Sequence, residues 1–226
     1  MDIKNIYNKI DKILKNEDEH TKETLEEIKR QLEVEIITGG KTNNNITSAF
    51  KRLVKDNEIR PRFQNVLINN DNKYTITNGY FLITYNQEQL PDQLKPFIDK
   101  TNDNMYNDFN YDKFKNTNEV VKISINWDLF TKVHKYNKLH KKVRSEFVLS
   151  DGFCFNIQYF MDIITLLGYK DISKDIELEY YPENHTTPMN IKSKNGNAIL
   201  LPIRCTDEQI TNALELQNKI LNNMEV

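Results

Sequence analysis

The feature that most constrains this fold is an Asn78-Gly79 dipeptide with apolar and polar residues alternating on both sides of it. Tyr74 and Ile76 precede the dipeptide, and Leu82 and neighbouring aromatic residues follow it. Such an alternation around Asn-Gly is the strongest short-range signal for a β-hairpin, because glycine adopts positive φ freely and asparagine tolerates the left-handed region. Turn chemistry alone would make this one hairpin among many. A helical pattern precedes it, however, and a similar helix-plus-strands unit follows later in the chain.

The first 42 residues carry a helical pattern. Apolar residues recur at spacings of three and four in two stretches. A polar segment at 16–20 separates the two stretches, and the second one ends at Gly39 and Gly40. This pattern predicts two amphipathic helices joined as an αα-hairpin. Each apolar stripe is too narrow to stand alone, so it must pack either on the chain's own domain or on a second molecule.

A third helix is predicted at 47–55, ending before Pro61 because the residue ahead of a proline avoids the helical region. Its apolar residues share one face, and Lys51, Arg52 and Lys55 lie away from that face. Strands are predicted at 63–68, 120–125, 147–149, 176–180, 188–193 and 198–202. Further helices are predicted at 127–133, at 156–168 and from Thr206 onward. Residues 88–118 are predicted to be a connector with one short helix near 93–98.

The overall charge is close to balanced, with 31 Lys and Arg against 33 Asp and Glu and a net charge of −2. Bulk charge therefore does not indicate a nucleic-acid partner, although a basic face can exist within a neutral total. The densest basic segment is 132–144, which includes Lys138, Lys141, Lys142 and Arg144. A cluster of this kind is either an electrostatic footprint for a phosphate backbone or a solvated surface.

The sequence offers no constellation typical of catalysis. Its four histidines are scattered, and its acidic residues are not coupled to a nucleophile, so we predict a protein without enzymatic activity, metal or cofactor. Cys154 and Cys205 form no CxxC motif, which indicates neither a zinc site nor a disulfide framework and favours a reduced, cytoplasmic setting. No apolar run is typical of an export signal or a membrane span, so no membrane association is expected.

Several segments, taken in order, resemble the bacterial DNA sliding clamp, the beta subunit of DNA polymerase III. Residues 155–162, Phe-Asn-Ile-Gln-Tyr-Phe-Met-Asp, are similar to the clamp's "FN-x-x-Y-L-x-D" helix start. Residues 77–82 resemble its "T-D-G-x-R-L" hairpin, and residues 188–191 with 198–204 resemble its closing "P-x-x-I … L-x-x-P-x-R" strands. The resemblance covers roughly 46–204 and implies an α+β DNA clamp fold of two helix-plus-antiparallel-sheet halves, at about 43–87 and 119–205.

The clamp resemblance also implies partners and sites. We expect a non-catalytic protein of DNA replication, working as a homo-oligomer or beside a replisome, that binds double-stranded DNA without sequence preference. Because such a contact is electrostatic, the residues expected to make it are chosen by their charge. They are Lys51, Arg52, Lys55, Lys138, Lys141, Lys142 and Arg144. In the clamp family, the hairpin and the last strand line an apolar pocket for short linear peptides of replication and repair proteins. The matching residues here, which are otherwise ordinary core, are Thr77, Gly79, Tyr80, Phe81, Leu82, Leu201, Pro202, Ile203 and Arg204.

This chain also departs from the clamp pattern. A clamp subunit carries three such domains, whereas residues 43–205 provide one, flanked by the helical hairpin at 1–42 and a helix at 206–226. Asn78 and Phe81 stand where the family has Asp and Arg, and the helix at 156–168 has no basic residue on its DNA-facing length. An alternative function is therefore an interaction or regulatory module that has a clamp-like fold and does not encircle DNA.

Overall fold

The computed structural model describes residues 44–56, 60–68, 73–99, 121–140, 146–170, 172, 175–181 and 187–222, together with Thr21, Lys22, Leu25, Ile28, Lys29 and Leu32. These isolated residues between 21 and 32 are helical, and the rest of the predicted hairpin at 1–42 lies outside the described residues. So does most of the predicted connector at 88–118. Within the described part of the chain, no helix combines the length and the apolar composition needed to cross a membrane.

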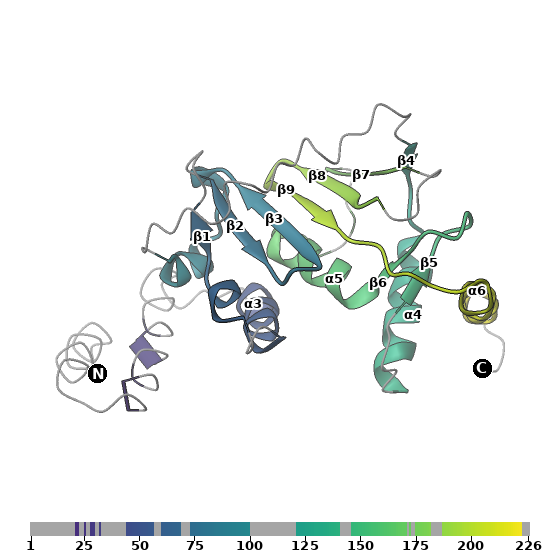
Figure 1. The fold of residues 1–226 in the computed structure, drawn as a ribbon, viewed down its shortest axis with the longest axis horizontal. Coiled ribbons are helices and arrows are strands. Elements are labelled where there is room, and N and C mark those ends of the chain that lie inside the picture. Colours follow the sequence, from purple (N-terminus) through teal and green to yellow (C-terminus); the bar gives the residue numbers. More distant parts are fainter. Residues whose placement is uncertain are drawn as a thin grey trace.

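The described elements mix helices and antiparallel strands (Figure 1). In chain order they are α3 (Asn44–Asp56), η1 (Pro61–Gln64), β1 (Leu67–Ile68), β2 (Tyr74–Thr77), β3 (Phe81–Tyr85), η2 (Gln87–Gln89), η3 (Asp92–Phe97), β4 (Val121–Ile123), α4 (Trp127–Leu139), β5 (Glu146–Val148), β6 (Cys154–Asn156), α5 (Ile157–Leu166), β7 (Ile176–Tyr180), β8 (Met189–Ser193), β9 (Gly196–Leu200) and α6 (Asp207–Leu221).

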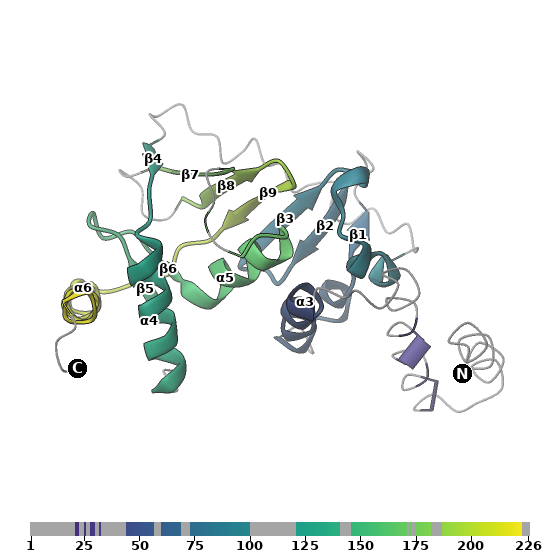
Figure 2. The ribbon, with the colours of Figure 1, turned by 180° about the vertical axis from the view of Figure 1, so that it is seen from behind.

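Seven strands form one antiparallel sheet in the order β1-β2-β3-β9-β8-β7-β4, and β5 and β6 form a separate pair. The predicted α+β class is therefore confirmed. Helices α3 and α5 lie beneath the same face of the large sheet in Figure 1 and in the reverse view of Figure 2. Side chains on that face pack against the apolar stripes of both helices, and Phe50 on α3 and Phe160 on α5 are completely buried.

Six neighbouring strands of this sheet, from β1 to β7 in the sheet order, are arranged as two similar units. Helix α3 is followed by the antiparallel meander β1-β2-β3, and α5 is followed by the meander β7-β8-β9. The last strands of the two units pair antiparallel, with Phe81 opposite Leu200 and Thr84 opposite Asn197. An antiparallel pair has a local two-fold axis. From either end of these six strands, the order is therefore the first, second and third strand of one unit. The two helices also pack against each other.

A cluster of aromatic rings joins the second unit to α4 and to the small sheet. The Phe130 ring on α4 lies 5.0 Å from that of Phe147 on β5 and 5.2 Å from that of Phe160 on α5. Phe155 on β6 lies 5.4 Å from Phe160. All four rings are buried, and tilted or edge-on pairs at such separations add to the stabilisation from buried area. The core therefore extends beyond the large sheet to include α4, β5 and β6.

The predicted hairpin is present, but its connection is longer than a two-residue Asn-Gly turn. Strand β2 ends at Thr77, opposite Leu82, and β3 begins at Phe81, so residues 78–80 connect the two strands. The Asn78 side-chain oxygen accepts hydrogen bonds from the backbone N–H groups of Tyr80 (2.9 Å) and Phe81 (3.0 Å). Asn78 therefore acts as a local side-chain cap of the turn, and Gly79 has positive φ, at 85°.

The Arg60 side chain lies close to Gly79. A Cβ at this position would lie 2.4 Å from a guanidinium nitrogen of Arg60, whose side chain donates to the Asn78 carbonyl oxygen. That nitrogen is the end of a long, exposed side chain that can shift, so the positive φ is what favours glycine here.

Two other local predictions need correction. The predicted strand at 63–68 is wrong at its start, because Phe63 and Gln64 belong to the 3-10 helix η1, which begins at Pro61. Proline has the φ angle of a first helical turn, and the Phe63 N–H donates to the Arg60 carbonyl. The predicted helix at 127–133 was too short: α4 continues to Leu139, because its lysines are good helix formers and lie at the surface.

The predicted C-terminal helix is confirmed as α6, and Thr206 and Gln209 form the expected capping box. Its apolar stripe is interrupted by Gln217, which is 6% exposed. The Gln217 amide accepts from the Val148 N–H and donates to the Val148 carbonyl, both at 2.9 Å. A glutamine side chain thus pairs with the backbone of β5 as a neighbouring strand would, and this attaches α6 to the small sheet.

Candidate functional site

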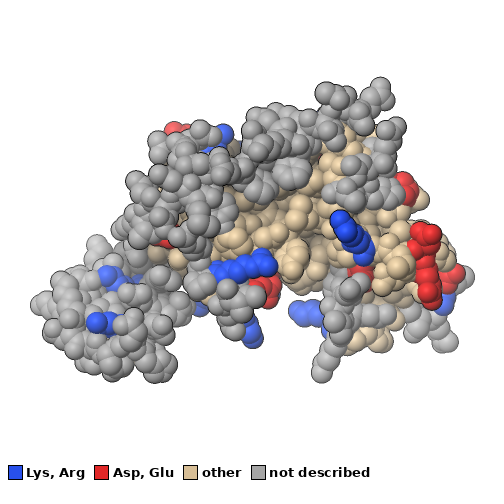
Figure 3. Space-filling model, in the orientation of Figure 1, with Lys and Arg blue, Asp and Glu red and all other residues tan. Residues whose placement is uncertain are grey.

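The surface of α3 carries three of the residues that the sequence predicts to contact DNA. The apolar residues Ile46, Ala49, Phe50 and Leu53 are buried, whereas Lys51, Arg52 and Lys55 are exposed. The helical period of 3.6 residues produces this division, because the two sets fall on opposite sides of the helix. Blue side chains lie along the lower edge of the molecule at α3 in Figure 3, and red side chains gather near α6.

Arg52 connects α3 to α5 through an ion pair. One of its guanidinium nitrogens lies 2.5 Å from a carboxylate oxygen of Asp162, and the Gln158 amide donates to the same oxygen at 3.0 Å. The Arg52 side chain is 49% exposed and that of Asp162 only 7%. The acid is thus enclosed and its cationic partner still faces solvent. The charge of Arg52 is therefore only partly available to an anionic ligand.

Burial raises the pKa of the Asp162 carboxyl above its ordinary value, against the opposing hydrogen bond and charge of Arg52. Burial likewise raises the pKa of Asp56 at the end of α3, against the charges of Arg52 and Lys55. Two acids therefore accompany three cations on the α3 and α5 surface. Helix α5 supplies no basic residue there, as the sequence indicated.

Helix α4 brings a second set of cations toward the same surface. Lys135 and Lys138 are exposed, while Lys132 pairs with Asp128 at 2.8 Å. Burial lowers the pKa of His134, and the positive charges of Lys138 and Arg52 lower it further. Arg52 on α3 and Lys138 on α4, two of the predicted DNA contacts, thus both act on the charge of His134. Lys141, Lys142 and Arg144 lie outside the described residues.

The two segments predicted to line a peptide pocket are neighbours in the fold. The Leu201 N–H donates to the Tyr80 carbonyl at 2.9 Å, beyond the point where β3 and β9 pair. Tyr80 is 52% exposed, and its ring stacks on that of Tyr159 from α5 with 5.7 Å between ring centroids. The chain that follows β9 then runs along β6, where Pro202 forms an antiparallel bridge with Phe155.

The predicted pocket residues divide into a buried set and an accessible set. Thr77, Phe81 and Leu82 are buried, and the Thr77 hydroxyl donates to the Phe81 carbonyl at 2.6 Å. Their positions in the sheet are those of core residues. Gly79, Tyr80 and Arg204 are exposed, and Leu201, Pro202 and Ile203 are half-buried. A peptide would therefore meet the hairpin tip and residues 201–204, and would not reach the side chains beneath them.

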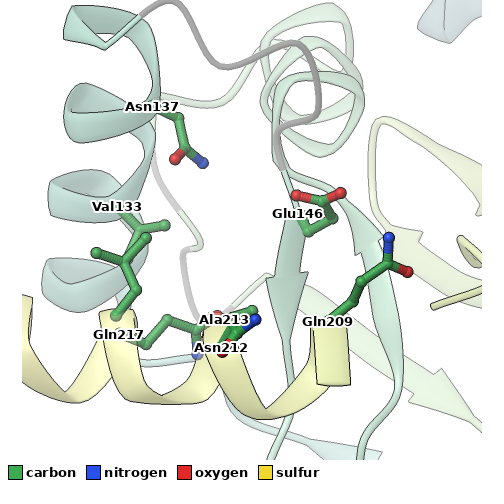
Figure 4. Close-up of a pocket in the computed structure, with 8 residues that line it drawn as sticks. Val133, Asn137, Glu146, Gln209, Asn212, Ala213 and Gln217 are labelled. Carbon is green, nitrogen blue, oxygen red and sulfur yellow. The ribbon is translucent and has the colours of Figure 1, made fainter. Parts of the chain in front are cut away.

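A cavity of about 190 Å³ lies elsewhere, between α4, α6 and β5. Figure 4 shows side chains from all three elements around it, including Asn137 on α4, Glu146 on β5 and Gln209 on α6. Its lining mixes polar and apolar side chains in similar shares, and the buried amide of Gln217 forms part of its wall. Sequence patterns did not predict this cavity. Its only sequence signal was the interruption of the α6 apolar stripe at Gln217.

Over the described ranges, no group of three or more His, Cys, Asp or Glu side chains is arranged to hold a metal ion. Comparisons with protein-family models, with curated proteins and with solved structures found no match. A function for this chain has to be inferred from its own residues and their arrangement.

Proposed function

We propose that this chain is a non-catalytic protein with a DNA clamp fold, that it acts in DNA replication, and that it holds duplex DNA without reading its sequence. The observation that supports this most directly is the repeated order of helix and three-stranded meander, α3-β1-β2-β3 and α5-β7-β8-β9, joined through β3 and β9. Two helix-plus-sheet halves with adjacent helices are what the resemblance to the sliding clamp predicts for one clamp domain. In that family, the helices face the DNA.

The charge distribution supports a weak, non-specific contact. Lys51, Arg52 and Lys55 point away from the core on α3, and Lys135 and Lys138 do so on α4. Asp56 and Asp162 reduce the net positive charge of this surface. A clamp must slide along DNA, so its hold is expected to be topological and its contacts with phosphates few. One domain cannot surround a duplex, and the proposal therefore requires a homo-oligomer.

The test is a fluorescence-anisotropy titration of the full chain with labelled duplex DNA at several salt concentrations. We expect weak binding that does not depend on sequence, and that weakens with salt at a log–log slope of roughly −0.9 per phosphate neutralised. Two duplexes of unrelated sequence serve as the matched pair. Strong preference for one duplex, or no binding at low salt, contradicts the proposal.

Replacing Asp162 with Asn is expected to strengthen DNA binding several-fold and to steepen the salt slope by about 0.9, because one opposing charge is removed from beside Arg52. The fold should tolerate this change. The side-chain oxygen of the introduced asparagine can still accept from Gln158, and Arg52 is too exposed for its ion pair to contribute much stability. The measurement is the same titration on the Asp162→Asn variant, and unchanged or weaker binding would place the DNA contact away from α3 and α5.

The same variant has an expected pH dependence of stability. The pKa of Asp162 is raised in the folded protein, so the folded state binds this proton more tightly than the unfolded chain does. Ionisation therefore lowers stability as the pH rises through the folded pKa, and the Asp162→Asn variant escapes this loss. We expect Asp162→Asn to gain stability relative to the unmodified protein at neutral pH and to lose that advantage below about pH 4. Urea denaturation of both proteins at a series of pH values measures the difference.

The alternative is an interaction module that has the same fold and no DNA inside it. It is favoured by α5, which contributes an acid and no base, and by Tyr80, which is 52% exposed beside Leu201. An exposed aromatic ring next to half-buried apolar residues is the kind of surface on which a short linear peptide anchors. Absence of DNA binding in the titration above would make this the leading function.

A further inference from the structure

The fold brings the two cysteines of the chain together. Cys154 and Cys205 are 51 positions apart, and the Sγ atom of Cys205 lies 3.0 Å from that of Cys154. Both are free thiols in the structure. Cys154 begins β6, and Cys205 directly precedes Thr206, the N-cap residue of α6.

The backbone holds the two residues in place. The Ile203 N–H donates to the Cys154 carbonyl at 2.8 Å, and Pro202 forms an antiparallel bridge with Phe155. The segment that leaves β9 therefore runs along β6, and this pairing carries Cys205 to the start of that strand. A disulfide bond has a sulfur–sulfur distance of about 2.05 Å, so its formation here requires the two sulfur atoms to move closer by about 1 Å.

We propose that Cys154 and Cys205 are a redox-sensitive pair that forms an intramolecular disulfide on exposure to a small-molecule disulfide such as glutathione disulfide. This inference does not depend on the proposed function. It concerns a chemical modification of the chain, and it rests on the geometry of the two thiols.

The two cysteines have different parts in the reaction. Cys205 is half-buried and can meet an oxidant, whereas Cys154 is 2% exposed. Burial and the neighbouring Cys205 raise the pKa of the Cys154 thiol, which makes it the poorer first nucleophile. The Cys205 thiolate attacks one sulfur of glutathione disulfide, and one glutathione thiolate leaves. Cys154 then loses its proton and attacks the Cys205 sulfur of the mixed disulfide, which releases the second glutathione. Two protein thiols are oxidised, and one glutathione disulfide is reduced to two glutathione molecules.

The bond would fasten the start of α6 to the core. It would close a loop that contains α5, β7, β8 and β9, and so restrict the unfolded chain. At present, the Gln217 contact with Val148 holds the other end of this helix. Oxidation is therefore expected to raise the midpoint of thermal unfolding by about 5–10 °C.

The experiment treats the full-length protein with reduced or oxidised glutathione under native conditions. Free thiols are then counted with a chromogenic disulfide reagent, and the intact mass is measured without reductant. We expect the oxidised sample to lose both thiols, to lose the mass of two hydrogen atoms and to unfold at a higher temperature. Dithiothreitol should reverse all three changes.

The Cys205→Ser and Cys154→Ala variants are the controls. Cys205→Ser should keep its buried thiol after oxidant, and Cys154→Ala should stop at a mixed disulfide with glutathione, which raises its mass. Because Cys205 is only half-buried, its variant should fold even if Cys154→Ala does not. Two thiols remaining in the unmodified protein, a stable mixed disulfide at its Cys205, or a disulfide between two chains would each overturn the proposal.

Discussion

Reversing the charge of Lys51 and Lys55 to Glu is expected to weaken binding to duplex DNA by at least about tenfold at low salt. Both side chains are exposed on α3, next to the Arg52 charge that Asp162 partly neutralises. If each lysine neutralises one phosphate, the log–log salt slope should fall in magnitude by about 1.8. Fluorescence anisotropy over a range of salt concentrations measures both quantities.

The control is a variant with the same change in net charge elsewhere, Lys122→Glu with Lys219→Glu. Lys122 lies on β4 at the far edge of the sheet, and Lys219 lies on α6. Exposed charges of this kind contribute little to stability, so both double variants should fold. Equal weakening in the two variants would mean that only the total charge matters, and no weakening in either would place the DNA contact away from α3.

Replacing Gln217 with Met is expected to lower the free energy of unfolding by about 2–4 kcal/mol, because it removes both hydrogen bonds to the buried backbone of Val148. Methionine has a similar volume, so the packing of α6 is largely preserved and the lost polar contacts dominate. Urea denaturation followed by circular dichroism measures the change.

Asn218→Met is the matched control, because Asn218 is exposed on the same helix and its side chain can be replaced without burying a polar group. This variant should differ from the unmodified protein by no more than about 0.5 kcal/mol. A similarly small effect for Gln217→Met would show that α6 does not depend on its contact with β5.

Local patterns predicted most of the helices and hairpins. α3 and α5 follow from apolar spacings of three and four, and the strands β7 and β8 follow from alternation. These signals work because side-chain period and caps act within a few residues of each other. The prediction failed at 63–64, where Pro61 started a 3-10 turn in a segment that β-branched and aromatic residues marked as a strand.

The α+β class, the exposure of Lys51, Arg52 and Lys55, and the turn at Asn78-Gly79 could all be predicted from local patterns. The contacts of Arg52 with Asp162, of Tyr80 with Leu201 and of Cys154 with Cys205 could not, and they became visible in the folded chain. They join residues that are far apart in the sequence. These pairs are 110, 121 and 51 positions apart, and the pairing of β3 with β9 and of residues 202 and 203 with β6 brings them together. Local propensity and periodicity carry no information about contacts over such separations, because these contacts depend on which strands become neighbours.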